Sequence, residues 1–250
     1  MANFFLKLNP SKSHIIVFTP NSETNKIFIQ YTTLQNSYLC VSPQVLNLGI
    51  IIDNNLHFTP HINMILAQGY KLLRNIAGKI KYLSQDHIIT LIHSLVVSKI
   101  DNCNSILYGA NASEISRLQR FQNACARFIY GKKKRDHVSP LLQELHWLPI
   151  KQRIIFKILC IVFKSFHNMS PTYISELLIP IKENSTLLQI PRSNSTYGDR
   201  AFSSYAPKLW NALPLELRNI CTLETFKSQV KHHLFSSFQV YISKAFMYRN

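Results

Sequence analysis

The spacing of apolar residues changes once along the chain, near residue 56. Before that point they stand in short runs at 14–18, 27–31 and 45–52, separated by proline, asparagine, serine and threonine. Short apolar runs bounded by turn residues predict strands, which here would form a small antiparallel sheet. After residue 59 apolar residues recur at every third or fourth position, which predicts helices. The expected fold is therefore α+β and mostly α.

Three helices are expected between residues 56 and 131. Apolar residues from Ile62 to Leu83 keep the helical spacing, with Pro60 in the first turn, so the first helix is expected to be long. Short links to the next two helices favour antiparallel neighbours, and the three are expected to form a compact bundle. The residues placed to cap the three N-termini are Thr59, Ser84 and Ser113.

A second group of helices is expected after residue 131. Residues 149–166 are apolar nearly all round, which predicts a deeply buried helix, and Ser170 introduces a shorter helix over 171–178. Further helices are expected over 202–210 and over 222–238, the last with Thr222 as its cap. The chain then divides into strands in 1–55, a first helical bundle in 56–131, a second helical group in 132–178, a loop in 179–200 and a C-terminal helical extension in 201–250.

The charge of the chain is strongly unbalanced. It contains 28 Lys and Arg but 12 Asp and Glu, which gives a formal net charge of +16. Such an excess attracts polyanions, and its commonest use is to neutralise nucleic-acid phosphates. The candidate nucleic-acid-binding residues are Lys12, Lys71, Arg74, Lys79, Lys81, Lys132, Lys133, Lys134 and Arg135.

Two of these basic segments have more than one interpretation. The cations between residues 71 and 81 either follow the groove of a nucleic-acid duplex or form an ordinary solvated helix face. The consecutive basic residues 132–135 fit a phosphate-binding patch, a nuclear-import signal or a solvated loop. The sequence leaves these alternatives open.

No catalytic site and no metal site are expected. Two-metal phosphoryl transfer needs carboxylates that hold both ions together, whereas the acids of this chain are never adjacent. Asp53, Asp86 and Asp101 fall in three different expected elements, and Asp53 is expected to be a turn residue. No cofactor and no small-molecule substrate are therefore expected. The histidines that lack a second ligand pair at zinc-site spacing are His57, His61, His232 and His233.

Cysteine usage and hydropathy indicate the compartment. The five cysteines are widely separated and never form a C-x-x-C pair, so free and mostly buried thiols are expected. The longest apolar stretch, 154–163, is shorter than the ~20 residues of a membrane span, and no signal peptide is recognised. An intracellular protein, in nucleus or cytoplasm and not in a membrane, is expected. Trp147 and Trp210 are expected to anchor the core.

Several short sequence strings are too specific to arise by chance from the amino-acid composition of the chain. They follow the order found in the C-terminal half of reverse transcriptases from jockey-type non-long-terminal-repeat retrotransposons, which the chain resembles over nearly its whole length. The strings are Phe5-Leu-Lys-Leu-Asn-Pro-Ser-Lys-Ser13, Asn47-Leu-Gly-Ile-Ile-Ile-Asp53, His57-Phe-Thr-Pro-His-Ile62, Val97-Ser-Lys-Ile-Asp-Asn-Cys-Asn-Ser105, Leu145-His-Trp-Leu-Pro149, Phe156-Lys-Ile-Leu159, Gly198-Asp-Arg-Ala-Phe202 and Ala206-Pro-Lys-Leu-Trp-Asn-Ala-Leu-Pro214.

The resemblance implies a division into polymerase parts. Residues 1–55 would be the end of the palm, 56–131 the helical thumb, and the remainder the family's C-terminal extension. The family's aromatic-Ala-Asp-Asp signature, which binds two metal ions, lies upstream of the Leu-Asn-Pro-Ser-Lys string that ends here at Lys12, and this chain begins almost at that string. Lys12 itself matches a basic residue of the family at the end of the palm, where the resemblance implies that it protonates the leaving pyrophosphate or lies near incoming phosphates. Without the metal site that role has no reaction to serve, and the alternative is a solvated turn lysine.

The implied function is that of a truncated retrotransposon reverse transcriptase, from a family of RNA-directed DNA polymerases. The isolated chain is not expected to be an enzyme, and Mg²⁺ is expected only for the intact parent. Its expected partner is an RNA or RNA/DNA template–primer duplex, bound by the basic thumb. The alternatives are a helical module that a host retains for binding protein or nucleic acid, and a non-functional relic.

Overall fold

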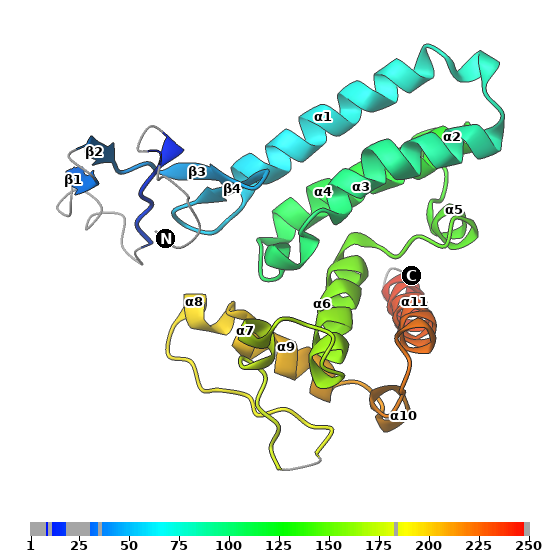
Figure 1. Ribbon diagram of the computed structural model, residues 1–250. Coiled ribbons are helices and arrows are strands. Elements are labelled where there is room, and N and C mark those ends of the chain that lie inside the picture. The colour runs from blue at the N-terminus through cyan, green and yellow to red at the C-terminus, as the bar shows by residue number, and fades with distance from the viewer. Residues whose placement is uncertain (1–8, 10–11, 19–30, 35–36, 183–184, 248–250) are drawn as a thin grey trace.

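The computed structural model describes residues 9, 12–18, 31–34, 37–182 and 185–247 (Figure 1). The described part is mostly helical, with two small antiparallel sheets near its N-terminal end, so the expected α+β, mostly α class is confirmed. Both ribbon views show α1 to α4 side by side in one group and α6 to α11 gathered in a second group next to it.

The strands form two hairpins. β1 (Tyr31–Leu34) pairs with β2 (Ser37–Cys40), and β3 (Gln44–Asn47) pairs with β4 (Ile50–Asp53). The latter hairpin contacts the start of α1, so it is the strand pair that leads directly into the helical bundle.

Neither of the first two expected strands has the expected bounds in the described residues. The strand expected over 14–18 is wrong, because only Ile15 pairs there, in an isolated parallel bridge to Val41. Of the strand expected over 27–31, residues 27–30 lie outside the described residues, and β1 begins at Tyr31.

The single strand expected over 45–52 is wrong as well, because a two-residue turn divides it. Leu48 and Gly49 have φ values of 47° and 85°, and both central residues of a type I′ hairpin turn need φ above zero. Glycine adopts this conformation without strain. Leu48 is 93% exposed, so its apolar side chain marks the turn rather than the core.

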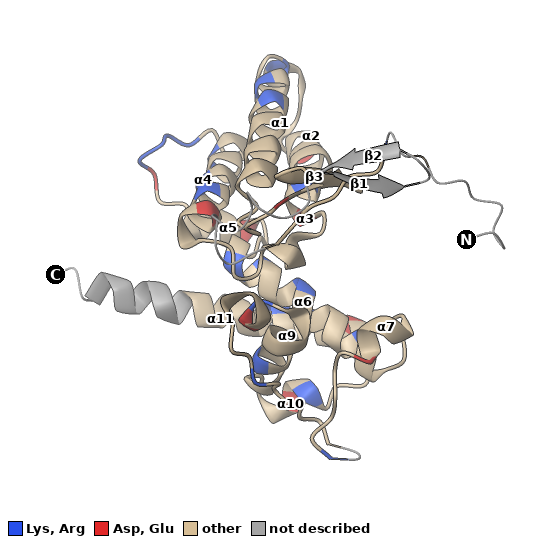
Figure 2. Ribbon diagram, turned by 90° about the vertical axis from the view of Figure 1, so that its left-hand side faces the viewer, with Lys and Arg blue, Asp and Glu red and all other residues tan. Residues whose placement is uncertain are grey.

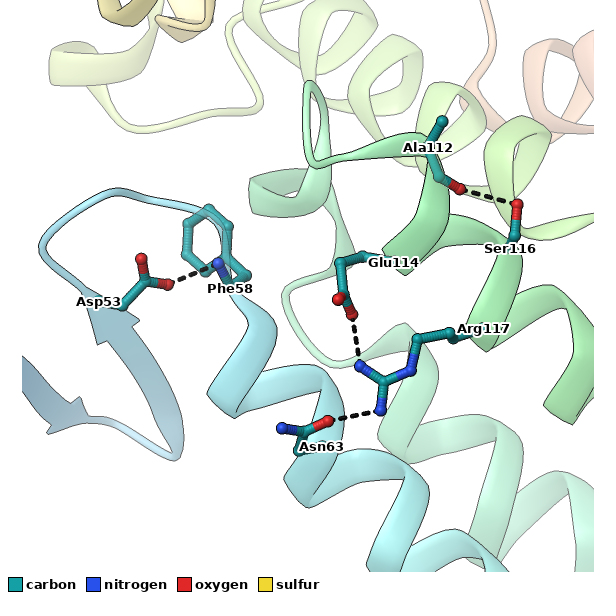
Figure 3. Close-up of polar contacts among 7 residues, drawn as sticks. All are labelled: Asp53, Phe58, Asn63, Ala112, Glu114, Ser116 and Arg117. Carbon is teal, nitrogen blue, oxygen red and sulfur yellow. Dashed lines mark hydrogen bonds and ion pairs between the residues drawn. The ribbon is translucent and has the colours of Figure 1, made fainter.

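The first helix, α1 (Thr59–Ala77), begins at a carboxylate supplied by β4. Asp53 Oδ1 accepts the backbone N–H groups of Asn55 and His57 at 3.1 and 3.0 Å. Its Oδ2 accepts the N–H of Phe58 at 2.6 Å (Figure 3). The turn role expected for Asp53 is confirmed. The expected cap is wrong: Phe58 is the N-cap, and Thr59 is already helical.

The end of α1 also differs from the expectation. The helix stops at Ala77, followed by Gly78 at the C-cap, instead of continuing to Leu83. The chain then forms one 3₁₀ turn, η4 (Ile80–Tyr82). Lys79 precedes this turn and Lys81 lies within it, so both leave the helix on which the sequence pattern had placed them.

The remaining elements of the first group confirm the compact bundle. Ser84 caps α2 as expected, its Oγ accepting the His87 N–H at 3.4 Å. Asn111, not Ser113, occupies the N-cap of α4. Figure 1 shows α1, the α2–α3 segment and α4 lying alongside one another. The elements are α2 (Gln85–Ile92), the π-helical η5 (His93–Val97), α3 (Ser98–Asp101), the 3₁₀ turn η6 (Asn104–Leu107) and α4 (Ala112–Ile129).

The second group is built around α6, which begins one residue after Pro149. Lys151 and Lys157 are the exposed residues of this helix, so the deep burial expected for it is confirmed. Thr222 caps the last helix, also as expected, by accepting the Thr225 N–H at 3.4 Å. The elements are α5 (Ser139–Glu144), α6 (Ile150–Phe166), α7 (Thr172–Ser175), α8 (Thr196–Asp199), α9 (Phe202–Asn211), α10 (Leu215–Arg218) and α11 (Leu223–Met247).

The segment 179–200, which was expected to be a loop, is held to this group by hydrogen bonds between its main chain and the side chain of Asn211. The amide side chain of Asn211 receives the Leu188 N–H at 2.9 Å and donates to the Leu188 carbonyl at 2.8 Å. Leu188 is 1% exposed, so the segment contributes to the core. Its last residues form α8, which the sequence pattern did not predict, and the helix expected over 171–178 is reduced to the single turn α7.

Two glutamines of α4 join the two helical groups. Gln122 is 1% exposed and donates to the Leu148 carbonyl at 2.9 Å. Gln119 Oε1 accepts the Ile150 N–H at 2.8 Å, which satisfies one of the unpaired amides in the first turn of α6. The polar side of α4 therefore fixes where α6 starts.

Some expectations for single residue types are confirmed, and one is partly wrong. Trp147 and Trp210 are 3% and 1% exposed, so both belong to the core as expected. Of the cysteines whose state is described, all are free thiols, but Cys103 and Cys221 are exposed while Cys125 and Cys160 are buried. The expectation that the thiols are mostly buried therefore holds for only two of these four.

His61, in the first turn of α1, makes the fold sensitive to acid. Its side chain is 3% exposed, and burial lowers its pKa from the ordinary value of 6.5. The unfolded chain therefore takes up a proton at a higher pH than the folded protein does, and stability is lost as the pH falls below that value. We expect the free energy of unfolding, measured by urea titration, to decrease between about pH 7 and pH 5.

The substitution His61→Gln is expected to flatten part of this pH dependence. Glutamine keeps an acceptor for the Ile51 N–H, which lies 3.5 Å from His61 Nδ1, but it does not titrate. The same change at the exposed His57 is the control and is expected to leave the dependence as it is. Identical pH dependence in the two variants would contradict this role for His61.

Candidate nucleic-acid interface

Two cations of the predicted site lie on the solvent side of α1. Leu73 and Ile76 of this helix face the bundle core and are 7% and 6% exposed. Lys71 lies two residues before Leu73, about 200° away around a helix of 3.6 residues per turn, so its side chain leaves the opposite side. Arg74 follows three residues after Lys71, on the neighbouring turn. Both side chains are exposed.

The next two cations continue this surface beyond the end of the helix. Lys79 and Lys81 are exposed in the turn that follows Gly78. The Lys81 Nζ lies 5.0 Å from the centre of the Tyr82 ring, and Tyr82 is 77% exposed. An exposed aromatic ring beside a cation offers a stacking surface as well as charge. We call Lys71, Arg74, Lys79 and Lys81 the helix-end cation group.

The helix-end cation group keeps its charge unpaired. Within the described ranges, none of its members forms an ion pair with an acid or a side-chain hydrogen bond. Asp86, the next acid along the sequence, lies exposed in the first turn of α2. The positive potential of the four side chains therefore reaches solvent with little local compensation.

The loop after α4 carries the second predicted group, Lys132, Lys133, Lys134 and Arg135, which we call the loop cations. All four are exposed, and Figure 2 shows the blue loop projecting beyond α4. Its backbone is fixed at both ends. The Arg127 guanidinium donates twice to the Asp136 carbonyl at 3.0 Å, and the Asp136 carboxylate accepts the Lys133 N–H at 2.7 Å.

Lys12 does not join either group. It is exposed in a turn in which its N–H donates to the Asn9 carbonyl at 3.1 Å. That turn belongs to the strand-containing part of the chain, and Figure 1 shows α1 leading away from the strands toward η4. The structure therefore brings Lys71, Arg74, Lys79 and Lys81 into one region and leaves Lys12 at the other end of α1.

Two acids of the bundle, Glu114 and Asp101, pair with arginines that tie its helices to their neighbours. Glu114 is 8% exposed, and its Oε2 lies 2.9 Å from Arg117 Nη1 (Figure 3). The same guanidinium donates to Asn63 Oδ1 at 2.5 Å, which ties α4 to α1. Asp101 pairs with Arg153 of α6 at 2.5 Å. Because these acids neutralise internal cations, the surface cations remain in excess.

Sequence reasoning missed two exposed cations on the bundle, Lys99 of α3 and Arg120 of α4. Arg120 lies on α4, next to the fully buried Phe121, and is itself exposed. The helical spacing could have found it, because the residues that flank it in space on the same side, Ser116 and Asn123, are polar.

No grouping of metal ligands occurs among the residues described. Nowhere in those ranges do three His, Cys, Asp or Glu side chains lie close enough to hold one ion. Asp53, Asp86 and Asp101 belong to β4, α2 and α3, three separate elements as the sequence indicated. No helix in the described ranges combines the length and the hydrophobicity that a membrane span requires.

Comparison with known proteins finds no matching family model, no matching curated protein and no matching solved structure.

Proposed function

We propose that the chain binds double-helical RNA or RNA/DNA through the helix-end cation group. The observation that supports the proposal is the set of four exposed cations without acidic partners, two on α1, which is anchored in the core, and two in the turn that follows it. Lysine and arginine side chains of this kind neutralise phosphates and release the counterions condensed on a duplex. The loop cations supply a second set of phosphate contacts in the same proposal.

The geometry favours contacts to the backbone of a duplex rather than to its bases. Lys71 and Arg74 lie on neighbouring turns, so they follow one line along α1, and Lys79 and Lys81 extend it past the helix end. Phosphate contacts position a protein on a duplex but carry no sequence information. Binding is therefore expected to depend little on nucleotide sequence, and the exposed Tyr82 ring adds stacking on an unpaired base.

We further propose that the chain is the thumb-containing part of a reverse transcriptase of the non-long-terminal-repeat type. The sequence strings support this origin, as does the order of a strand hairpin followed by a helical bundle. On this proposal the helix-end cation group holds the template–primer duplex, and the nucleotidyl transfer itself belongs to the metal site of a polymerase palm.

Salt dependence of binding tests the proposed function. A fluorescein-labelled RNA/DNA duplex is titrated with the protein in NaCl between about 50 and 300 mM, and fluorescence anisotropy gives the dissociation constant. The four contacts of the helix-end cation group predict that log K falls with log salt with a slope of about −3 to −4, and four further contacts from the loop cations steepen the slope to about −7. A folded, monodisperse protein whose affinity ignores salt, or that binds no nucleic acid, would favour a protein-interaction module instead.

A further inference from the structure

A cavity of about 410 Å³ lies where the two helical groups meet, and none of the residues that line it belongs to either cation group. Its wall comes from α2 and η5, from α3 and η6, from the turn before α6, from α6 itself and from α11. Small-molecule sites commonly have this volume and this position between packed elements. The proposed duplex contacts use none of its residues.

The charge that lines the cavity is positive. Arg153 and Lys157 stand one turn apart on α6, and Lys231 joins them from α11. Asp101 is the acid of this wall, and it already pairs with Arg153 Nη1 at 2.5 Å. Two ammonium groups therefore lack a counter-charge in the wall. Burial, followed by the charge of Arg153, lowers the pKa of Lys231, as expected for a cation that lacks an anionic partner.

Two buried polar atoms beside the cavity have no hydrogen-bond partner in the described structure. They are Arg153 Nε, a donor, and Asn104 Oδ1, an acceptor. The amide of Asn104 cannot be reversed to satisfy its oxygen, because its Nδ2 donates to Asp101 Oδ1 at 3.3 Å and a reversed amide would place two oxygens together. Buried polar atoms are rarely left unpaired in proteins, so each calls for a partner.

The backbone around the cavity is irregular at two places. His146, in the turn before α6, has a φ of 53°, and His93 begins the π-helical segment η5. Both residues line the cavity. Left-handed non-glycine residues and π-helical turns cost stability and occur often where a protein builds a binding site.

We propose that this cavity binds a small phosphate monoester that carries a hydroxyl group, such as a sugar phosphate. The phosphate oxygens accept hydrogen bonds from Lys157, Lys231 and Arg153 Nε, because charge-assisted bonds to phosphate are the strongest that these donors form. A hydroxyl of the same molecule donates to Asn104 Oδ1. One ligand thereby pairs the uncompensated cations and both unpartnered atoms.

Isothermal titration calorimetry with three probes tests the proposal: ribose 5-phosphate, inorganic phosphate and ribose. Ribose 5-phosphate is expected to bind, inorganic phosphate to bind at least about tenfold more weakly because it leaves Asn104 Oδ1 without a sugar hydroxyl, and ribose not to bind measurably. Asn104→Ala is expected to abolish the preference for ribose 5-phosphate over inorganic phosphate.

Two lysines of α11 provide the matched pair of variants. Lys231→Gln is expected to weaken ribose 5-phosphate binding at least about tenfold. Lys227→Gln, one turn earlier and exposed outside the cavity wall, is expected to leave it unchanged. Thermal unfolding checks that each variant is folded. If Lys231→Gln does not fold, Lys157→Gln, at an exposed position of the same wall, replaces it.

Several results would overturn the proposal. They are the failure of all three probes to bind folded protein, equal affinity for ribose 5-phosphate and inorganic phosphate, and an equal loss of affinity in Lys231→Gln and Lys227→Gln. None of these outcomes depends on duplex binding, so the cavity and the cation groups are tested separately.

Discussion

Replacing Gly69 by alanine is expected to destabilise the protein by about 2 kcal/mol. A Cβ at this position would lie 2.3 Å from Phe121 Cζ and 2.7 Å from Cε1. Phe121 is 0% exposed, so its ring has no free space into which it can retreat. Alanine gains about 1 kcal/mol over glycine in a helix, but an overlap this close costs more. Urea unfolding measures the difference.

Gly78 provides the matched control on the same helix. It has a φ of −64° at the C-cap of α1, and an added Cβ would meet nothing closer than the Asn75 carbonyl oxygen at 3.8 Å. Gly78→Ala is therefore expected to stabilise the protein by about 0.4 to 1 kcal/mol, because alanine lowers the entropy of the unfolded chain.

A second substitution tests the cause of the effect at Gly69. Phe121→Leu removes the ring atoms that the new Cβ would meet, and in that background Gly69→Ala is expected to change sign and become stabilising. A destabilisation of the same size in both backgrounds would show that the close approach of α1 and α4 is not the reason why position 69 requires glycine.

The long helices could be predicted because each has an apolar side at regular spacing. On α1, for example, the buried Ile62 and Ile65 are three positions apart, as are Leu73 and Ile76. The helix ends were less predictable. Asp53 caps α1 from an earlier strand, five residues before the Phe58 N–H that it accepts, and no pattern of neighbouring residues signals such a reach.

The turn at Leu48 and Gly49 could not be predicted from hydrophobicity. Leu48 continues the apolar run over 45–52, so the pattern predicts one unbroken strand. Only the φ of 47° at Leu48 shows that the chain reverses there. Gly49 was the available indication of a turn, because glycine favours this conformation. The apolar Leu48 beside it favoured a continuous strand instead.

The candidate cations named from the sequence are all exposed, but their arrangement could not be predicted from it. Lys79 and Lys81 were placed on α1 because the apolar spacing continues past Gly78, whereas they occupy a separate turn. The cavity at the junction was not predicted at all. Its ion pair joins Asp101 to Arg153, 52 residues apart, and Lys231 comes from a third element, so only the folded chain brings them together.

Neutralising the helix-end cation group is expected to weaken duplex binding about a hundredfold or more. The variant Lys71→Gln, Arg74→Gln, Lys79→Gln and Lys81→Gln removes four positive charges at exposed positions, so the fold is expected to persist. Loss of four phosphate contacts is also expected to reduce the salt slope by about 3 to 4. Circular dichroism and the urea midpoint confirm that the variant remains folded.

The matched control removes the same charge elsewhere. Lys164, Lys182, Arg192 and Lys227 belong to the second helical group and its loop, and changing all four to glutamine lowers the net charge of +16 by the same amount. Non-specific attraction by overall charge would weaken binding equally in both variants, whereas a defined interface would not.

The most direct test of this account is the duplex dissociation constant of these two variants, measured side by side by fluorescence anisotropy at about 100 mM NaCl, where phosphate contacts still dominate affinity. The proposed interface predicts a loss of about a hundredfold in the helix-end variant and less than about threefold in the control. Equal losses in the two variants, or no loss in the helix-end variant, would contradict it.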